Sequence, residues 1–253
     1  MSNAALFTSV AREYAEFRPG YPPELFAWLA GIAPALDAVW DCGCGSGQAS
    51  VALAAHFTTV HATDVAAEQV AAARPHPRVR YSVAPAERSG LPDASVDLVT
   101  VAQALHWFDV DAFYAEARRV GRPGALLAVW NYPRPRFVDP DLDRVFFDFY
   151  SDEVGPYWPA GRRHIEANYT TLAFPFREIQ HPPFGLELDW SFEQVIGYVS
   201  SWSATAQYRK ALGRDPVPLL RQTLGAIWPG DGALAAVRIP LGLRVARLDS
   251  VAG

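Results

Sequence analysis

Three glycines stand at alternate positions of one short segment, Gly43, Gly45 and Gly47, and a carboxylate, Asp41, precedes them. The apolar residues before them predict a buried strand, and the residues after them predict the first turn of a helix. Glycine has no Cβ, so a ligand can approach the backbone of such a turn closely, and the N–H groups at the start of the helix then face it. This combination predicts a site for a nucleotide-like ligand, and Asp41 favours one with a cationic or amine group over a pyrophosphate.

The spacing of these glycines separates two classes of site. A dinucleotide fingerprint follows the pattern G-x-G-x-x-G, whereas this segment follows G-x-G-x-G and has Gln48 where the third glycine of the fingerprint would stand. The spacing therefore argues against a nicotinamide dinucleotide. The alternative is a tight strand-to-helix turn that binds no ligand. Polar residues further along the chain make this alternative less favoured.

Polar residues also follow the next two predicted strands. Asp64 ends the strand predicted over residues 59–63, and a carboxylate at that place can accept hydrogen bonds from both hydroxyls of a ribose. It could instead, or in addition, cap the helix predicted to begin near Ala66. Ala86 and Glu87 follow the third predicted strand, where a small and a polar side chain can flank an adenine. The carboxyl ends of parallel strands form one edge, at which ligands bind in open α/β sheets.

A run of polar and aromatic residues from Gln103 to Phe108 follows the strand predicted over residues 96–102. Such groups would lie beside the reactive end of a ligand bound at the same edge. His106 is a candidate general base, because the pKa of an unperturbed imidazole lies near neutrality. The alternative is a histidine that positions the cofactor or substrate through a hydrogen bond, or that only packs.

Strand and helix patterns alternate regularly between residues 39 and 130. Such alternation predicts an α/β fold, a parallel sheet with helices on both faces. The stretch 132–235 is different, because it is rich in aromatic residues and too often interrupted by prolines for further β-α units. We expect it to be an aromatic-rich insertion over the ligand edge of the sheet, placed before the last strands. An ordinary extension of the core is the alternative.

The composition limits the functions that this chain can have. Its 253 residues carry 22 Lys and Arg against 27 Asp and Glu, a net charge of −5, and no long basic run, so no nucleic-acid partner is expected. No apolar run reaches the length of a membrane span and the first residues lack a signal sequence, which predicts a cytoplasmic protein without a membrane partner. The two cysteines, Cys42 and Cys44, are badly spaced for a disulfide, and no cluster with metal-ligand spacing accompanies them.

The motifs form an ordered set along the first half of the chain. They are Tyr14 to Pro19, the glycine turn with Asp41, Asp64, Ala86-Glu87 with Leu91-Pro92, Asp97 to Val99, Ala104 to Phe108, and Arg122 to Leu126. In this set the chain resembles the class I S-adenosylmethionine (SAM) dependent methyltransferases. Within them it resembles the methyltransferase type 11 group and its trans-aconitate methyltransferase-like branch. The resemblance covers roughly residues 8–131 well.

The resemblance implies a Rossmann-like, seven-stranded, mostly parallel sheet whose last strand is antiparallel. It assigns the glycine turn and Asp41 to the methionine part of SAM, Asp64 to the ribose and Ala86-Glu87 to the adenine. It also implies an N-terminal arm, from which Arg18 pairs with the SAM carboxylate and Tyr14 packs or bonds nearby. The residues expected to bind the cofactor are Tyr14, Arg18, Asp41, Gly43, Cys44, Gly45, Gly47, Gln48, Asp64, Val65, Ala86, Glu87, Gln103 and Ala104.

The expected reaction is methyl transfer from SAM to a small molecule, with S-adenosylhomocysteine as the product. The sulfonium is already a strong methyl donor, so the protein has chiefly to align the acceptor and exclude water. The branch resemblance favours a carboxylate or hydroxyl oxygen as acceptor, while nitrogen and carbon acceptors stay open. An ionised carboxylate needs no base, whereas other acceptors can use His106. The expected acceptor-side residues are His106, Trp107 and Trp158, and the two indole rings could also face the sulfonium.

Two other functions stay open: a catalytically inactive SAM-binding domain with an interaction or regulatory role, and, as a lesser alternative, an NAD(P)-dependent oxidoreductase. We expect one domain, acting as a monomer or homodimer. Its expected parts are an N-terminal arm (1–36), a cofactor-binding core (37–131), a substrate-covering insertion with helices (132–235) and a closing strand (236–253).

Overall fold

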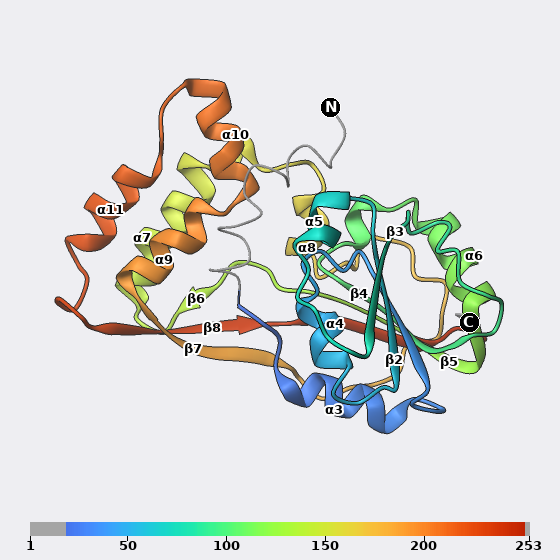
Figure 1. The fold of residues 1–253 in the computed structure, drawn as a ribbon. Coiled ribbons are helices and arrows are strands. Elements are labelled where there is room, and N and C mark those ends of the chain that lie inside the picture. Colours follow the sequence, from blue (N-terminus) through green and yellow to red (C-terminus); the bar gives the residue numbers. More distant parts are fainter. Residues whose placement is uncertain (1–18, 251–253) are drawn as a thin grey trace. The chain divides into compact units, whose positions relative to one another are not determined.

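The computed structural model describes residues 19–250, which form two compact units (Figure 1). The core unit comprises Gly20–Pro133, Arg163–Phe184 and the final segment from Leu241. The second unit comprises Arg134–Arg162 and Gly185–Pro240. No helix within residues 19–250 combines the length and the apolar character that a membrane span requires.

The core unit is built on a six-stranded sheet with the order β3-β2-β1-β4-β5-β9. Its strands are β1 (Ala38–Cys42), β2 (Thr59–Asp64), β3 (Val79–Val83), β4 (Val96–Ala102), β5 (Gly121–Asn131) and β9 (Gly242–Arg247). The first five strands run parallel, and β9 is antiparallel to β5. The strand order reverses between β1 and β4, which is where open α/β sheets bind ligands. The predicted Rossmann-like α/β fold and its antiparallel last strand are confirmed.

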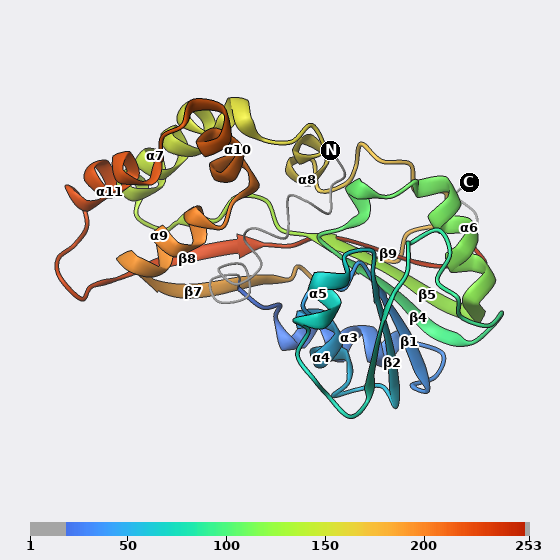
Figure 2. The same cartoon turned by 45° about the horizontal axis from the view of Figure 1, so that its top comes forward.

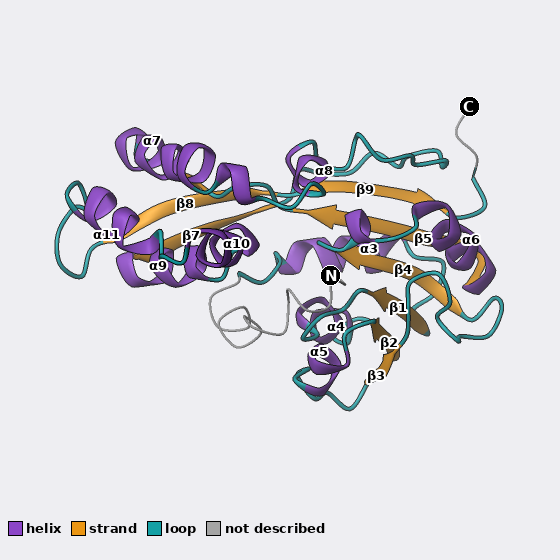
Figure 3. Ribbon diagram, turned by 90° about the horizontal axis from the view of Figure 1, so that it is seen from above, coloured by secondary structure: helices purple, strands orange, loops and turns teal. Residues whose placement is uncertain are grey.

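Helices cover both faces of this sheet, and α4 and α6 lie on opposite sides of it (Figures 2 and 3). The helices are α3 (Pro23–Ile32), α4 (Gln48–Leu53), α5 (Ala67–Ala71), the 3-10 turn η1 (Leu105–Trp107), α6 (Val110–Val120) and α8 (Arg162–Glu166). One apolar cluster joins α3 and α4 to the strands, and a second joins α6 to them. Because both faces are covered, the central strand β4 is buried almost throughout, as its continuous apolar run predicts.

The prediction of seven strands was wrong. The place beside β9 is taken by an irregular segment, which makes a single bridge between Glu178 and Ala246 and one hydrogen bond from the Ile179 N–H to the Val245 carbonyl (2.7 Å). Residues 182–183 are prolines and have no N–H to donate to a ladder. The pairing therefore ends after one bridge, and the segment does not become a strand of the sheet.

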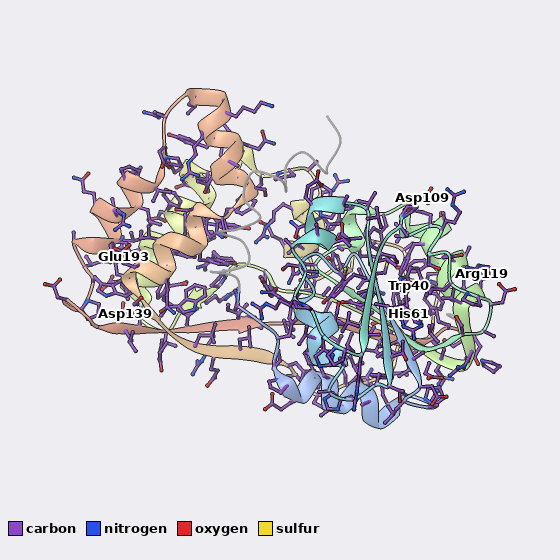
Figure 4. The ribbon with its side chains drawn as sticks, viewed as in Figure 1. Trp40, His61, Asp109, Arg119, Asp139 and Glu193 are labelled. Carbon is purple, nitrogen blue, oxygen red and sulfur yellow. The ribbon has the colours of Figure 1, made fainter. Side chains whose placement is uncertain are left out.

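The second unit contains a three-stranded antiparallel sheet in the order β6-β8-β7. Its elements are β6 (Arg136–Phe137), α7 (Pro140–Asp148), the π-helical turn η2 (Phe149–Glu153), the 3-10 turn η3 (Gly155–Tyr157), β7 (Gly185–Ser191), α9 (Phe192–Ser200), α10 (Ser203–Leu212), α11 (Val217–Gly225) and β8 (Leu234–Pro240). The side chains of Asp139 and Ser191 cap the first turns of α7 and α9. Glu193 joins α9 to α11 through two hydrogen bonds from Arg221 (2.5 and 2.6 Å; Figure 4).

One buried carboxylate, Asp97, holds the amino-terminal edge of the core sheet. Its Oδ2 accepts hydrogen bonds from the backbone N–H groups of Asp37 and Ala38 (3.0 Å each), and its Oδ1 accepts one from the Arg122 guanidinium (2.8 Å). These bonds join β4 to the starts of β1 and β5. The edge opposite the glycine turn is thus closed by protein groups alone.

A second buried carboxylate, Asp41, joins three elements at the other end of β1. The side chain is fully buried, and its two oxygens accept hydrogen bonds from the hydroxyls of Ser50 in α4 (2.5 Å) and Thr100 in β4 (2.9 Å). Burial raises the pKa of Asp41 to about 6, because the lost hydration of the charged form outweighs these two hydroxyl bonds, and the Asp64 carboxylate raises it further.

Asp41→Asn should change how the stability of the protein depends on pH. The folded wild type holds the Asp41 proton up to about pH 6, whereas the unfolded chain releases it near pH 3.8. The free energy of unfolding of the wild type should therefore fall as the pH rises through this window, by up to roughly 3 kcal/mol, since the folded state binds the extra proton. Asparagine does not titrate, so the variant should lack this component. Denaturant unfolding of both proteins at pH 4 and pH 7 measures it, and equal pH slopes would contradict the raised pKa.

Candidate functional site

All three glycines of the turn after β1 have a left-handed backbone, with φ of +70° at Gly43, +53° at Gly45 and +83° at Gly47. They differ in what a Cβ would meet. At Gly43 a Cβ would lie 2.6 Å from the Cβ of Ala104, and at Gly47 it would overlap the hydroxyl of Tyr81. These two glycines therefore make room for protein groups, which pack directly on the turn.

Gly45 is the glycine that leaves space for a ligand. A Cβ there would meet only the Oε1 of Gln69, at 3.9 Å. The Gly45 N–H donates a hydrogen bond to the Oδ2 of Asp64 at the end of β2 (2.8 Å). A ligand was expected to approach the backbone at all three glycines, and the structure leaves space for this approach at Gly45.

Asp64 accepts two backbone hydrogen bonds, from Gly45 on its Oδ2 and from Ala66 on its Oδ1 (2.9 Å). Asp64 is not the N-cap of α5, as one alternative had it, because the N-cap residue is Ala66 and the N–H of Ala66 itself donates the bond to Asp64. A carboxylate has about four acceptor positions, so two are left for the hydroxyls of a ribose. The bond to Gly45 holds this carboxylate beside the open part of the turn.

Neighbouring groups fix the turn before any ligand binds. The N–H groups of Gly43 and Cys44 both donate to the carbonyl of Thr63 (2.8 and 3.0 Å). The Thr63 hydroxyl in turn accepts a hydrogen bond from the indole N–H of Trp40 (2.9 Å), a residue in the interior of the core unit (Figure 4). The turn is therefore a rigid extension of β1 and β2.

Both cysteines of the turn are free thiols. Burial raises the pKa of Cys42 and of Cys44 well above the usual range, and the charge of Asp41 raises both further. The thiols therefore stay protonated near neutral pH, and neither is a ready nucleophile or metal ligand. They act as small groups packed at the turn.

Three further residues expected to bind the cofactor lie after β2 and β3, and two of them, Ala86 and Glu87, were expected beside the adenine. Val65, next to Asp64, is 65% exposed, an apolar surface on which a base could pack, while Ala86 is buried in the cluster on the α6 side. The Oε1 of Glu87 accepts a hydrogen bond from the backbone N–H of Asp109 (3.0 Å), the N-cap of α6 marked in Figure 4. This bond ties the loop after β3 to the loop after β4, and the adenine role of these residues stays a prediction.

The loop after β4 begins with a strained residue, Gln103. Its φ is +61°, which is uncommon for any residue other than glycine, and its N–H donates to the carbonyl of Trp130 (2.9 Å). Its Nε2 is buried without a hydrogen-bond partner in the described part of the chain. Ala104 follows and packs on Gly43. Strain and an unpaired polar atom at one position are typical of functional sites.

His106 in η1 contacts a residue that the sequence analysis missed. Its Nδ1 lies 3.2 Å from the hydroxyl of Tyr169, and its ring lies 4.6 Å, centroid to centroid, from that of Trp107. Tyr169 is fully buried, and both it and Asn168 have a left-handed backbone, with φ of +60° and +49°. Nothing in the residues around Tyr169 indicated this contact, because Tyr169 and His106 lie far apart in the sequence.

Asn131, the last residue of β5, is the second residue that was missed. It is fully buried, and both polar atoms of its side chain lack a hydrogen-bond partner within residues 19–250. A signal did exist in the sequence, since a polar residue directly follows the apolar run that ends at Trp130. Such positions lie at the carboxyl edge of a parallel sheet, where ligands bind.

The other predicted site residues are less closely tied to this edge. Gln48 is the first residue of α4 and directly follows Gly47. Trp158 belongs to the second unit, where its ring packs on those of Tyr150 and Trp202 (5.1 and 5.3 Å), and its role at the acceptor stays a prediction. Tyr14 and Arg18 lie outside the described residues.

Known proteins resemble this chain over most of its length. A family model described as a methyltransferase domain matches residues 40–129. A proposed methyltransferase of Dictyostelium discoideum is 34% identical over 241 residues, which cover 93% of this chain and 92% of that protein. A proposed SAM-dependent methyltransferase of Saccharomyces cerevisiae is 29% identical over 171 residues, 62% of this chain and 58% of that protein.

A solved structure gives the same result. It is that of a proposed type II methyltransferase from Anaeromyxobacter dehalogenans, with 46% identity, a TM-score of 0.86, and coverage of 92% of this chain and 98% of the other. Similarity at this level along nearly the whole chain, on a sheet whose carboxyl edge carries the open glycine turn, means that the chain belongs to the S-adenosylmethionine-dependent methyltransferases.

Proposed function

We propose that this methyltransferase transfers the methyl group of SAM to an oxygen of a small molecule, a carboxylate or a hydroxyl, and releases S-adenosylhomocysteine. The observation that supports the cofactor site is the pair formed by Gly45, with open space on its Cβ side, and Asp64, whose carboxylate is held beside it. Membership of the family removes the nicotinamide-dependent oxidoreductase as an alternative. The choice of an oxygen acceptor rests on the resemblance to the trans-aconitate methyltransferase-like branch.

In this proposal residues of the carboxyl edge contact SAM along its length. In this proposal Asp64 accepts the ribose hydroxyls, and the exposed Val65 packs on the adenine beside Ala86-Glu87. The remaining cofactor contacts fall to the methionine part, and the residues assigned to it are Asp41, Gly43, Cys44, Gly45, Gly47, Gln48, Gln103 and Ala104. When bound, SAM supplies a methyl group already activated for transfer.

The residues on the acceptor side then have to orient the acceptor and hold its proton. The Tyr169 hydroxyl, 3.2 Å from Nδ1, fixes the orientation of the His106 ring. If the acceptor is a hydroxyl, the imidazole can take its proton, and if it is a carboxylate, the ring positions it instead. The aromatic-rich stretch 132–235, which carries Trp158, is assigned to covering the acceptor and excluding water.

Asp64→Ala should weaken the binding of both SAM and S-adenosylhomocysteine at least tenfold. The change removes two hydrogen bonds from the ribose to a charged acceptor, each worth about 1.5–3 kcal/mol. Isothermal titration calorimetry measures the affinities, and circular dichroism checks that the variant is folded. The matched control is Asp111→Ala, which removes an exposed carboxylate in the first turn of α6 and should leave both affinities unchanged. Unchanged affinity in Asp64→Ala would remove the ribose role, and a wild type that binds no SAM would overturn the proposed function.

Two variants should distinguish a glycine that leaves space for a ligand from one that leaves space for protein packing. They are Gly45→Ala and Gly47→Ala. Each places a Cβ on a left-handed backbone, at about 1–2 kcal/mol of unfolding free energy. The Cβ at position 47 also meets the hydroxyl end of Tyr81, whose ring must turn away and lose its hydrogen bond to the Arg74 carbonyl, which should cost about 0.5–1.5 kcal/mol more. We expect Gly47→Ala to be the less stable variant in denaturant unfolding, and Gly45→Ala to lose SAM affinity beyond its small loss of stability. Equal destabilisation, or full SAM affinity in Gly45→Ala, would contradict this assignment.

A further inference from the structure

The core unit contains a buried carboxamide that no assigned role uses. Asn131 at the end of β5 is fully buried, and neither its Nδ2 nor its Oδ1 has a hydrogen-bond partner within residues 19–250. Leaving buried polar atoms unpaired is costly, and folded proteins pair nearly all of them. The carboxamide therefore points to a partner that is not part of the described chain.

The strand next to β5, β4, is followed by a residue whose carboxamide is also unpaired in the described chain. Ala102, the last residue of β4, is in register with Trp130 of β5, and the N–H of the following residue, Gln103, donates to the Trp130 carbonyl (2.9 Å), which places the backbone of Gln103 beside the end of β5. The Nε2 of Gln103 is also buried and unpaired in the described chain, and its backbone is left-handed. One carboxamide thus directly follows β4 and another ends β5, at the edge where α/β sheets bind ligands.

The alternation of side chains places Asn131 on the α6 face of the sheet. Along β5, Leu127 and Val129 belong to the apolar cluster that includes α6, whereas Trp130 belongs to the cluster with α3 and α4. The register of β5 with β9 is regular from residue 126 to residue 131. Asn131 therefore projects to the same side as Val129.

The residues next to Asn131 connect it to His106. Opposite Asn131 on β9 stands Gly242, and a Cβ there would collide with the side chain of Asn168. Paired residues of antiparallel strands project to the same face, so the Asn168 side chain borders Asn131. The next residue is Tyr169, whose hydroxyl contacts His106. The polar groups expected around a methyl acceptor are therefore contiguous with Asn131.

We propose that Asn131 binds the methyl acceptor and selects one that carries a hydroxyl next to a carboxylate, that is, a hydroxy acid. This assignment rests on the proposed methyl transfer from SAM to an oxygen acceptor. The Oδ1 of Asn131 accepts the hydrogen bond of the hydroxyl. The Nδ2 of Asn131 donates a hydrogen bond to the carboxylate, and so does the side-chain Nε2 of Gln103, whose backbone carbonyl stays assigned to the methionine part of SAM.

The set of donors and acceptors narrows the chemical class of the methyl acceptor to molecules that carry both a donor and an acceptor. Whichever way its amide is oriented, Asn131 presents one acceptor and one donor atom, and Gln103 adds a second donor. A simple carboxylate offers acceptors only, and an ammonium group offers donors only, so each would leave a buried atom of Asn131 unpaired. A hydroxy acid offers both, and sites built from such groups reject analogues that lack one partner.

The test is calorimetric titration of 2-hydroxybenzoate into the protein saturated with S-adenosylhomocysteine. The matched probe is benzoate, which has the same carboxylate and ring but no hydroxyl group. We expect the wild type to bind 2-hydroxybenzoate at least tenfold more tightly. In Asn131→Leu, which keeps the size of the side chain without its polar atoms, the two probes should bind alike. The variant should keep wild-type affinity for S-adenosylhomocysteine and a melting temperature equal to or above that of the wild type.

Trp130→Phe is the control variant. It removes the buried indole N–H of the neighbouring residue, which also lacks a partner in the described chain but lies on the opposite face of β5, and it should keep the tenfold preference. If Asn131→Leu does not fold, Asn131→Asp serves instead, because its second oxygen replaces the donor and should weaken 2-hydroxybenzoate at least tenfold.

The outcomes separate this proposal from the function on which it rests. A preference that survives in both Asn131 variants overturns the role of Asn131. A wild type that binds S-adenosylhomocysteine but neither probe, or both probes equally, overturns the assignment of a hydroxy acid. A wild type that does not bind S-adenosylhomocysteine overturns the proposed function itself.

Discussion

The hydrogen bond from the Gly45 N–H to the Asp64 carboxylate is the interaction on which the site depends (2.8 Å). It fixes the distance between the open part of the glycine turn and the carboxylate after β2. Neither partner can move freely, because the turn is bonded to Thr63 and packed against Ala104 and Tyr81. A ligand therefore meets groups that are already in place, and binding costs little in the ordering of the protein.

The two edges of the core sheet differ in how fully their buried polar side chains are hydrogen-bonded. At the amino-terminal edge, the buried Asp97 accepts two backbone hydrogen bonds and one from Arg122. At the carboxyl edge, Gln103 directly after β4 and Asn131 at the end of β5 carry atoms that are unpaired within residues 19–250. If the carboxyl edge served stability alone, we would expect its buried polar atoms to be hydrogen-bonded as fully as those of Asp97, since unpaired buried polar atoms lower stability. The contrast is consistent with the proposed binding of a ligand at the carboxyl edge.

The features that the sequence predicted correctly depend on short segments. The strand of residues 96–102 was located to the residue, because its apolar run is continuous and begins and ends at clear signals. The glycine turn and Asp64 were recognised from their spacing, and the structure brings both together. The seventh strand was wrong, because it was carried over from the resemblance, whereas the prolines at 182–183 stop the ladder in this chain.

The acceptor side was harder to predict because its residues come from distant segments. Tyr169 reaches His106 only after α8 has returned the chain to the core unit, and Asn168 borders Asn131 only because β9 pairs with β5. None of these contacts leaves a periodic pattern or a fixed spacing. The cofactor side, by contrast, lies in two strand-turn units that follow each other in the chain. This difference explains in physical terms why the sequence identifies the cofactor readily and the acceptor hardly at all: the first is recognised by local backbone geometry, and the second by side chains that only the tertiary fold brings together.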